Sequence, residues 1–219
     1  MGIEVVFLDI GGVMYDDRVY ANAVRAALRE LGAVFTDDEF AAEYAACRRD
    51  QGGSFRERLT RRFLGSDADV SEVEARAAPH WSYPPGTLEA DVVPCLRELS
   101  GRYRLGIIAN QPSAVREAMR RDGLTEFFSV WGVSDDVGLE KPDPRLFAHS
   151  LYAAAVPPSR AAMVGDRLDY DIRPAKQAGM RTVWVLRGEA PDDPTPEQLG
   201  EPDAAIRTLA ELPEVVARL

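Results

Sequence analysis

Short apolar segments recur along the chain, and between them lie longer segments in which apolar residues return every three or four positions. The apolar segments cover residues 5–8, 105–109, 128–133, 161–164 and 182–186. Their length, their β-branched residues and the glycines beside them favour buried strands over helices. The helical patterns between them cover 88–100, 113–122, 144–155 and 170–178. Strands that alternate with helices predict an α/β fold with a doubly wound parallel sheet.

Residues 17–84 follow a different pattern, because they contain helical segments and no convincing strand. The helical segments cover 19–31, 36–49, 54–64 and 69–78. The sequence Pro84-Pro85-Gly86 then marks a boundary. We therefore expect an all-helical cap domain at 17–84, inserted into a core domain formed by 1–16 and 85–219. In that position the insert could lie over the strand ends as a lid.

The end of the chain predicts one more strand and an amphipathic helix within 203–219. Residues 187–202 are rich in Pro, Asp and Glu, so we expect an exposed loop there.

The composition indicates a globular protein, since 46% of its 219 residues are hydrophobic. No uncharged apolar run approaches the roughly 18–20 residues of a membrane span. The first residues carry no basic segment, so we expect no signal peptide. Cys47 and Cys95 lie far apart without a CxxC spacing, which favours reduced thiols in a cytoplasmic protein.

The formal net charge of −10 argues against nucleic acid as a partner, because phosphate backbones are held by basic faces. A small phosphorylated molecule remains compatible with this charge, since one local cluster or a metal ion can override it. The two histidines, His80 and His149, show no metal-ligand spacing and are expected to be structural or surface residues. The chain could form a monomer or a homodimer.

Polar side chains follow three of the predicted strands. Asp9 ends the first strand, Asn110 follows 105–109, and Asp166 follows 161–164. Catalytic and binding groups of doubly wound sheets lie at the carboxyl ends of the strands, so we expect these three side chains to converge. A single carboxylate at such a turn, as at Asp9, could act as a nucleophile.

A second acidic segment, GDRLDYD at 165–171, places Asp169 and Asp171 shortly after Asp166. Carboxylate oxygens are the ligands that Mg²⁺ prefers, which favours a metal site at Asp9, Asp166 and Asp171. The alternative is that Asp166 and Asp169 only cap a helix. Lys141 lies in GLEKPDPRLF, in a loop stiffened by prolines, where its charge could hold a phosphoryl oxygen.

These segments, together with Gly12-Val13 after Asp9 and GDRLDYDIRPAKQAGM at 165–180, resemble the haloacid dehalogenase-like (HAD) hydrolases. The resemblance covers 1–16 and about 88–188, with the helical insert at the cap position of the family. It implies a Rossmann-like core and a phosphatase that forms an aspartyl-phosphate at Asp9. It also implies Mg²⁺ held by Asp9, Asp166, Asp171 and the carbonyl of Gly11.

The resemblance assigns catalysis to Asp9 and Lys141, and it implies a small phosphorylated substrate. The phosphate-binding positions that it implies are Gly12, Ala109, Asn110 and Lys141.

The chain departs from the family at two of its site positions. The phosphatases have a second aspartate, a general acid and base, where this chain has Gly11, and they have Ser or Thr where it has Ala109. General acid–base catalysis contributes about 10²–10⁴-fold, so a slower reaction is expected without a replacement. Backbone N–H groups near 109–110 and the Asn110 amide could replace part of the lost hydrogen bonding.

Three functions remain compatible with these departures. The first is an atypical phosphatase in which Asp16, Asp17, a cap residue or a water replaces the missing acid. The second is a catalytically weak binding or regulatory protein. The third is a 2-haloacid dehalogenase, whose halide leaves without a proton; the intact GDRLDYD segment disfavours it.

The helical insert would decide which substrate binds. An arginine-rich face of the insert could bind an anionic group, although a solvated helix face is the expected explanation for most of its arginines. The arginines of this face are Arg48, Arg49, Arg56, Arg58, Arg61 and Arg62. The segment 51–55 is the best candidate for a loop that reaches the site. Trp81 and Tyr83 are expected to pack the insert onto the core.

Overall fold

The computed structural model describes residues 2–219; Met1, which the predicted core range includes, lies outside the described residues. Six parallel strands form one sheet in the order β3-β2-β1-β4-β5-β6. The strands are β1 (Val5–Leu8), β2 (Arg104–Ala109), β3 (Phe128–Val133), β4 (Ala161–Gly165), β5 (Arg181–Val185) and β6 (Ala204–Ile206). Leu8 of the central strand β1 pairs with Ile107 of β2 and with Val164 of β4. The predicted parallel α/β sheet is confirmed.

Helices cover both faces of the sheet, which makes it doubly wound. Val6 and Leu8 of β1 belong to one hydrophobic cluster, and Val5 and Phe7 belong to another on the opposite face. The first cluster includes residues of α5 (Val92–Ser100), α6 (Val115–Arg121) and α11 (Leu212–Val216). The second includes residues of α8 (Pro144–Ala153) and α9 (Arg173–Gln177). Because β1 is buried on both faces, it is apolar throughout.

The shorter elements are α7 (Ser134–Val137), α10 (Pro196–Leu199), η1 (Ala78–His80), η2 (Thr125–Phe127), η3 (Pro158–Arg160), η4 (Leu168–Ile172) and η5 (Leu209–Glu211). Most of them adjoin a longer strand or helix, and α10 lies in the segment between β5 and β6. η4 is a π-helical turn, and it occupies the start of the helix that the sequence predicted at 170–178. None of the helices in the described part of the chain is long and apolar enough to cross a membrane.

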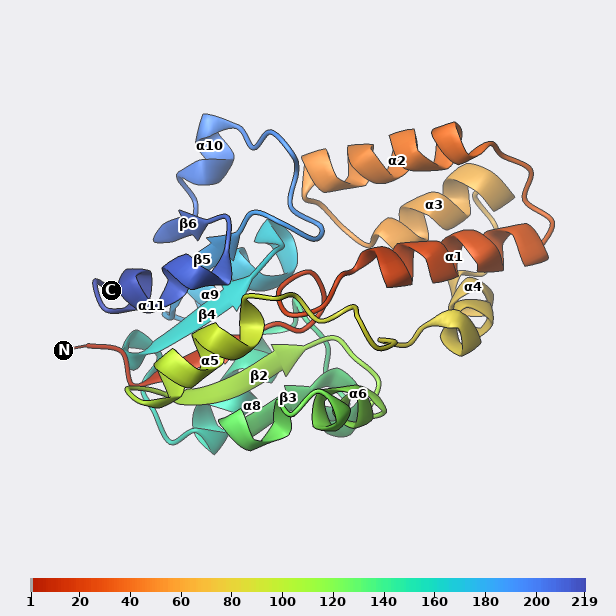
Figure 1. Cartoon of the computed structure of the whole chain (residues 1–219). Helices are drawn as coiled ribbons and strands as arrows, with labels where there is room; N and C mark the ends of the chain where they lie inside the picture. Colours follow the sequence, from red (N-terminus) through yellow and green to blue (C-terminus); the bar gives the residue numbers. More distant parts are fainter. Residues whose placement is uncertain (1) are drawn as a thin grey trace.

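The inserted segment forms α1 (Arg18–Glu30), α2 (Asp37–Asp50), α3 (Phe55–Leu64) and α4 (Val70–Ala77), which lie on the carboxyl-end side of the sheet (Figure 1). They surround a hydrophobic cluster of their own that includes Val24, Leu28, Phe40 and Leu59. Three of these helices have a side-chain cap at the N-terminus. Thr36 and Glu39 form a capping box at α2, and the side chains of Ser54 and Asp69 accept hydrogen bonds from backbone N–H groups at the starts of α3 and α4.

A row of aromatic rings joins the inserted helices to the core. Tyr15 stacks on Tyr83 with ring centroids 4.5 Å apart, and Tyr83 meets Trp81 at 6.2 Å. Trp81 in turn contacts Tyr20 of α1 at 4.9 Å. The packing role predicted for Trp81 and Tyr83 is therefore confirmed.

The prediction of an exposed loop at 187–202 is wrong for its first half. Glu189 and Ala190 are buried, because the segment passes between β5 and helix α2. The Arg48 guanidinium donates to the Ala190 carbonyl at 2.9 and 2.6 Å, and Gln51 Nε2 donates to the Glu189 carbonyl at 2.7 Å. The polar composition of 187–202 indicated exposure and gave no sign of this contact with the insert. The second half contains the short helix α10.

Candidate active site

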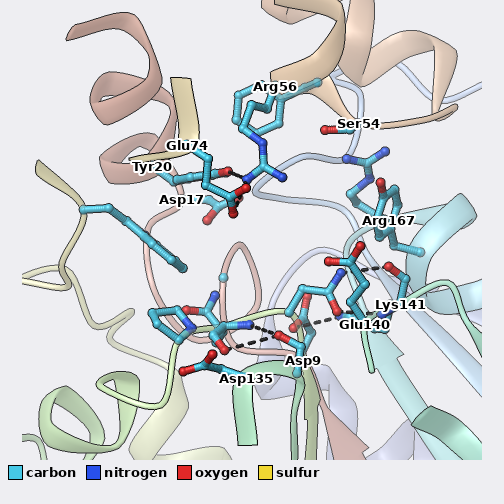
Figure 2. A pocket seen from close by; sticks show the side chains of 18 of the residues that line it. Asp9, Asp17, Tyr20, Ser54, Arg56, Glu74, Asp135, Glu140, Lys141 and Arg167 are labelled. Carbon is cyan, nitrogen blue, oxygen red and sulfur yellow. Dashed lines mark hydrogen bonds and ion pairs between the residues drawn. The ribbon is translucent and has the colours of Figure 1, made fainter. Parts of the chain in front are cut away.

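The polar residues at the strand ends meet at a cavity between the sheet and the inserted helices. Asp9, Asn110 and Asp166 follow β1, β2 and β4, which are neighbours in the sheet. All three line a cavity of about 1150 Å³. Figure 2 shows core residues such as Asp9 and Lys141 on one side of this cavity and Arg56 of the insert on the other. The convergence predicted from the strand order is present.

Three carboxylates and one lysine form the centre of the site. Oxygens of Asp9, Asp166 and Asp171 lie within 4.8 Å of one another. Lys141 Nζ lies 3.0 Å from Asp9 Oδ1 and 2.6 Å from Asp171 Oδ1. Asp171 and Lys141 are fully buried, and the Asp9 side chain keeps 14% exposure toward the cavity. Asp9 is thus the carboxylate of this group that is open to a substrate.

The negative charge of this group exceeds what Lys141 neutralises. Burial raises the pKa of Asp9 to about 6, although Lys141 acts in the opposite direction. Burial and the neighbouring Asp171 and Asp9 raise the pKa of Asp166 well above its usual range. Burial alone would lower the pKa of Lys141, but Asp171 and Asp9 hold it above its ordinary value. A further positive charge would relieve this repulsion.

The donor set fits a hard divalent cation. All three side chains offer carboxylate oxygens, the ligands that Mg²⁺ prefers. Backbone N–H groups orient two of them: Glu189 N donates to Asp166 Oδ2 at 2.7 Å, and Arg167 N donates to Asp171 Oδ2 at 3.0 Å. These hydrogen bonds fix the carboxylates, so a cation could bind without first ordering them.

Gly12 allows Asp166 to approach the turn after β1. Its φ is +68°, and a Cβ there would lie 2.0 Å from Asp166 Oδ2 and 3.1 Å from the Cα of Gly188. Any other residue would therefore collide with the acidic centre. The Gly12 N–H, at a predicted phosphate-binding position, donates to the Tyr15 carbonyl at 2.9 Å. Gly11, the predicted carbonyl ligand, lines the cavity beside Asp9.

The other two predicted phosphate-binding positions lie at the end of β2. Ala109 is fully buried in the core cluster. The Asn110 side chain bonds to the backbone of Lys141: Nδ2 donates to the Lys141 carbonyl at 2.8 Å, and Oδ1 accepts from the Lys141 N–H at 2.6 Å. Its side-chain amide therefore holds the lysine loop, which sequence reasoning had not assigned to it.

One arginine of the insert lines the cavity, and it is Arg56. Its Nη1 donates to Tyr20 Oη at 2.8 Å and to Glu74 Oε1 at 2.9 Å. Its Nε is buried without a hydrogen-bond partner among the described residues. A buried unpaired donor is costly, so a ligand acceptor would satisfy it. Most of the other arginines of the insert form ion pairs or hydrogen bonds elsewhere.

The segment 51–55 reaches the core, as the sequence suggested. Arg167 donates to the Gly53 carbonyl through Nη2 and to Glu189 Oε2 through Nη1, each at 2.7 Å. Gly53 N in turn donates to Asp169 Oδ2 at 2.8 Å. Sequence reasoning missed Arg167 and Glu189. Arg167 stands within the GDRLDYD motif and could have been considered, whereas Glu189 has no local signal, because its position depends on how 187–191 folds back.

A family model for haloacid dehalogenase-like hydrolases matches residues 3–179. The chain therefore belongs to the haloacid dehalogenase-like hydrolase family, and it is an enzyme of the hydrolase class. The six-stranded parallel sheet with its flanking helices is the α/β fold of this family in the present chain.

Its relatives include phosphatases and a dehalogenase. A glyceraldehyde 3-phosphate phosphatase from Methanopyrus kandleri is 30% identical over 229 residues, covering 99% of this chain and 98% of the relative. A phosphoserine phosphatase from Thermus thermophilus is 38% identical over 167 residues, or 73% of this chain and 64% of the relative's length.

Two solved structures share the whole fold. The structure of a HAD phosphatase from Thermococcus onnurineus has a TM-score of 0.64 and 26% identity, with 98% of each chain covered. A 2-haloacid dehalogenase from Pseudomonas syringae has the same TM-score, 28% identity and 99% coverage of each chain. The overall fold alone therefore does not separate the two chemistries.

Proposed function

We propose that the protein is a Mg²⁺-dependent phosphatase of small phosphorylated metabolites. The observation that carries this proposal is the group formed by Asp9, Lys141, Asp166 and Asp171. It combines one accessible carboxylate with a buried lysine and an oxygen donor set for a hard cation. A dehalogenase needs the accessible carboxylate but has no need for the cation site.

In the proposed reaction, an Asp9 oxygen attacks the phosphorus atom of the substrate and forms an aspartyl-phosphate, which water then hydrolyses. Lys141, 3.0 Å from Asp9, neutralises charge on the nucleophile and on a phosphoryl oxygen. Asp9, Asp166, Asp171 and the Gly11 carbonyl would hold Mg²⁺, which supplies charge neutralisation for the phosphoryl group. Asn110 keeps Lys141 in place through its backbone.

The cavity has room for more than a phosphoryl group. The inserted helices, which we propose as a cap domain at 17–84, contribute Tyr20, Arg56 and Glu74 to it. The unpaired Nε–H of Arg56 would donate a hydrogen bond to a carboxylate or carbonyl oxygen of a substrate. The names of the relatives support glyceraldehyde 3-phosphate and phosphoserine as the first substrates to test.

Two further features concern the partner and the cellular location. The net charge of −10 opposes binding to nucleic acid. Cys47 and Cys95 are both free thiols, which supports a cytoplasmic location.

Phosphate release from a panel of esters tests this function. The panel contains acetyl phosphate, p-nitrophenyl phosphate, glyceraldehyde 3-phosphate and phosphoserine, each with and without Mg²⁺. We expect Mg²⁺-dependent release that Asp9→Asn abolishes. Chloride release from 2-chloropropionate, without phosphate release, would favour the dehalogenase. Binding of Mg²⁺ with no release of either product would favour a binding or regulatory protein.

A further inference from the structure

The space at position 11 is filled by a different residue. A Cβ built on Gly11 would lie 2.6 Å from Asp17 Oδ1 and 2.9 Å from Tyr83 Oη. The first distance is close to that between the Cβ and the carboxylate oxygens within a single aspartate. Asp17 therefore brings a carboxylate oxygen to the place that a side chain at position 11 would occupy. Because Gly11 has no side chain, the Asp17 carboxylate can occupy this space.

Asp17 faces the cavity and has no role at the helix that it precedes. It stands at the N-cap position of α1, yet its side chain accepts no hydrogen bond from the first turn of the helix. It lines the same cavity as Asp9 and Gly11, and Figure 2 shows its carboxylate on the cavity wall. A partly buried carboxylate that does not cap its helix and lines the same cavity as Asp9 is available to a substrate.

The neighbouring Asp16 is engaged elsewhere. Its carboxylate accepts from Arg18 Nε at 2.9 Å and from Arg18 Nη2 at 2.6 Å, and also from the Arg18 N–H. Asp16 is absent from the residues that line the cavity. Of the two acids at the start of the insert, Asp17 alone therefore lines the cavity that contains Asp9.

We propose that Asp17 is the proton donor and acceptor of the reaction, in place of a side chain at position 11; this inference rests on the phosphatase function proposed above. As the bond from Asp9 to phosphorus forms, the bond from phosphorus to the leaving oxygen breaks. The leaving oxygen keeps the electron pair and takes the proton of the Asp17 carboxyl. The Asp17 carboxylate then takes a proton from water, whose oxygen bonds to phosphorus as the bond to Asp9 breaks.

The arrangement explains why position 11 holds glycine. A side chain there would displace Asp17 Oδ1 or Tyr83 Oη, since both lie closer than 3.0 Å to the Cβ position. Tyr83 is buried and accepts a hydrogen bond from Gln111 Nε2 at 3.1 Å, which limits its ability to move. Gly11 and Asp17 thus form a matched pair: the one leaves the space that the other fills.

The test compares two leaving groups in wild type, Asp17→Asn and Asp16→Asn. An alkoxide, as from glyceraldehyde 3-phosphate, needs a proton to leave, whereas p-nitrophenolate does not. We expect Asp17→Asn to slow release from the alkyl ester by about 10²–10⁴-fold. With p-nitrophenyl phosphate it should give a burst of p-nitrophenol at near the wild-type rate, followed by slow turnover, because only hydrolysis of the aspartyl-phosphate then needs Asp17. Asp16→Asn should behave like wild type.

The inference is overturned if Asp17→Asn leaves alkyl-ester turnover unchanged, or slows the p-nitrophenol burst as much as the alkyl ester. Gly11→Ala provides a second test, since its Cβ would displace the Asp17 carboxylate and should reproduce the same pattern. Wild-type kinetics in Gly11→Ala would contradict the matched pair. If the wild type releases phosphate from no ester, the proposed function itself fails; normal wild-type release with unaltered Asp17→Asn kinetics contradicts this inference alone.

Discussion

The side chain of Asn110 and the backbone of Lys141 exchange two hydrogen bonds, of 2.8 and 2.6 Å. The residue after β2 thereby sets the position of the loop that carries the lysine, although the two residues are 31 positions apart in the chain. Because Lys141 in turn contacts Asp9 and Asp171, the hydrogen bonds of Asn110 support the whole acidic centre.

Loss of these hydrogen bonds should slow turnover, because it releases the loop that carries Lys141. We expect Asn110→Ala to lower kcat by roughly 10²-fold, since a displacement of about 1 Å can have that effect on a positioned group. Asn110→Asp keeps the acceptor for the Lys141 N–H but loses the donor, so an intermediate rate is expected. Steady-state kinetics on the best substrate measure both variants. Wild-type kcat in Asn110→Ala would show that the lysine loop holds its position without Asn110.

Removal of the lysine charge should destabilise the protein. Lys141→Met leaves Asp9 and Asp171 without their counter-charge, and breaking one side of a buried ion pair costs about 3–5 kcal/mol. Urea denaturation measures this loss in the free energy of unfolding. Lys176→Met is the matched control, because Lys176 is exposed and should change stability by less than about 0.5 kcal/mol. Equal stability of the two variants would contradict the account of the buried charges.

Mg²⁺ should stabilise the folded protein through the three carboxylates. A ligand at 100 times its Kd adds about 2.7 kcal/mol, which raises Tm, and a chelator should reverse the rise. Asp166→Asn should abolish the effect, whereas Asp135→Asn should retain it, since Asp135 lines the cavity outside the metal-binding group. A thermal melt with and without Mg²⁺ measures both. The same rise in Tm in Asp166→Asn would place the cation elsewhere.

Arg56 should affect binding more than the chemical step. If its unpaired Nε meets an acceptor on the substrate, Arg56→Gln should raise KM by about 10-fold or more, the value of one hydrogen bond to a charged group. Acetyl phosphate, which has little beyond its phosphoryl group, should be affected much less. Arg61→Gln is the control, because Arg61 pairs with Glu57 on an exposed helix face. An equal rise in KM for acetyl phosphate would contradict a role in substrate recognition.

The strand order explains how much of this site could be predicted. Three apolar segments that the pattern predicts as parallel strands end at Asp9, Asn110 and Asp166. Because the carboxyl ends of parallel strands lie at one edge of the sheet, the convergence of these side chains could be predicted from the pattern. The four helices of the insert also lie within one residue or so of their predicted bounds, because α1, α3 and α4 have a clear apolar period and α2, α3 and α4 have side-chain caps.

The remaining contacts depend on how distant segments meet. Glu189 is bound to the site by the return of 187–191 toward the insert, and its polar neighbours suggested exposure instead. The choice between Asp16 and Asp17 depends on the direction in which the chain enters α1, which periodicity does not determine. The phosphate-binding assignment of Gly12, Ala109 and Asn110 stays a prediction.

The most direct test of the central claim is to trap the covalent bond at Asp9. The protein is mixed with acetyl phosphate and Mg²⁺, quenched during turnover and treated with borohydride, which reduces an aspartyl-phosphate but not a free carboxylate. Mass spectrometry of the peptide containing Asp9 then reads the result. We expect the reduced product at Asp9, dependent on Mg²⁺ and absent from Asp9→Asn. Continued phosphate release with Asp9 unmodified, or reduction at another carboxylate, would contradict the proposed nucleophile.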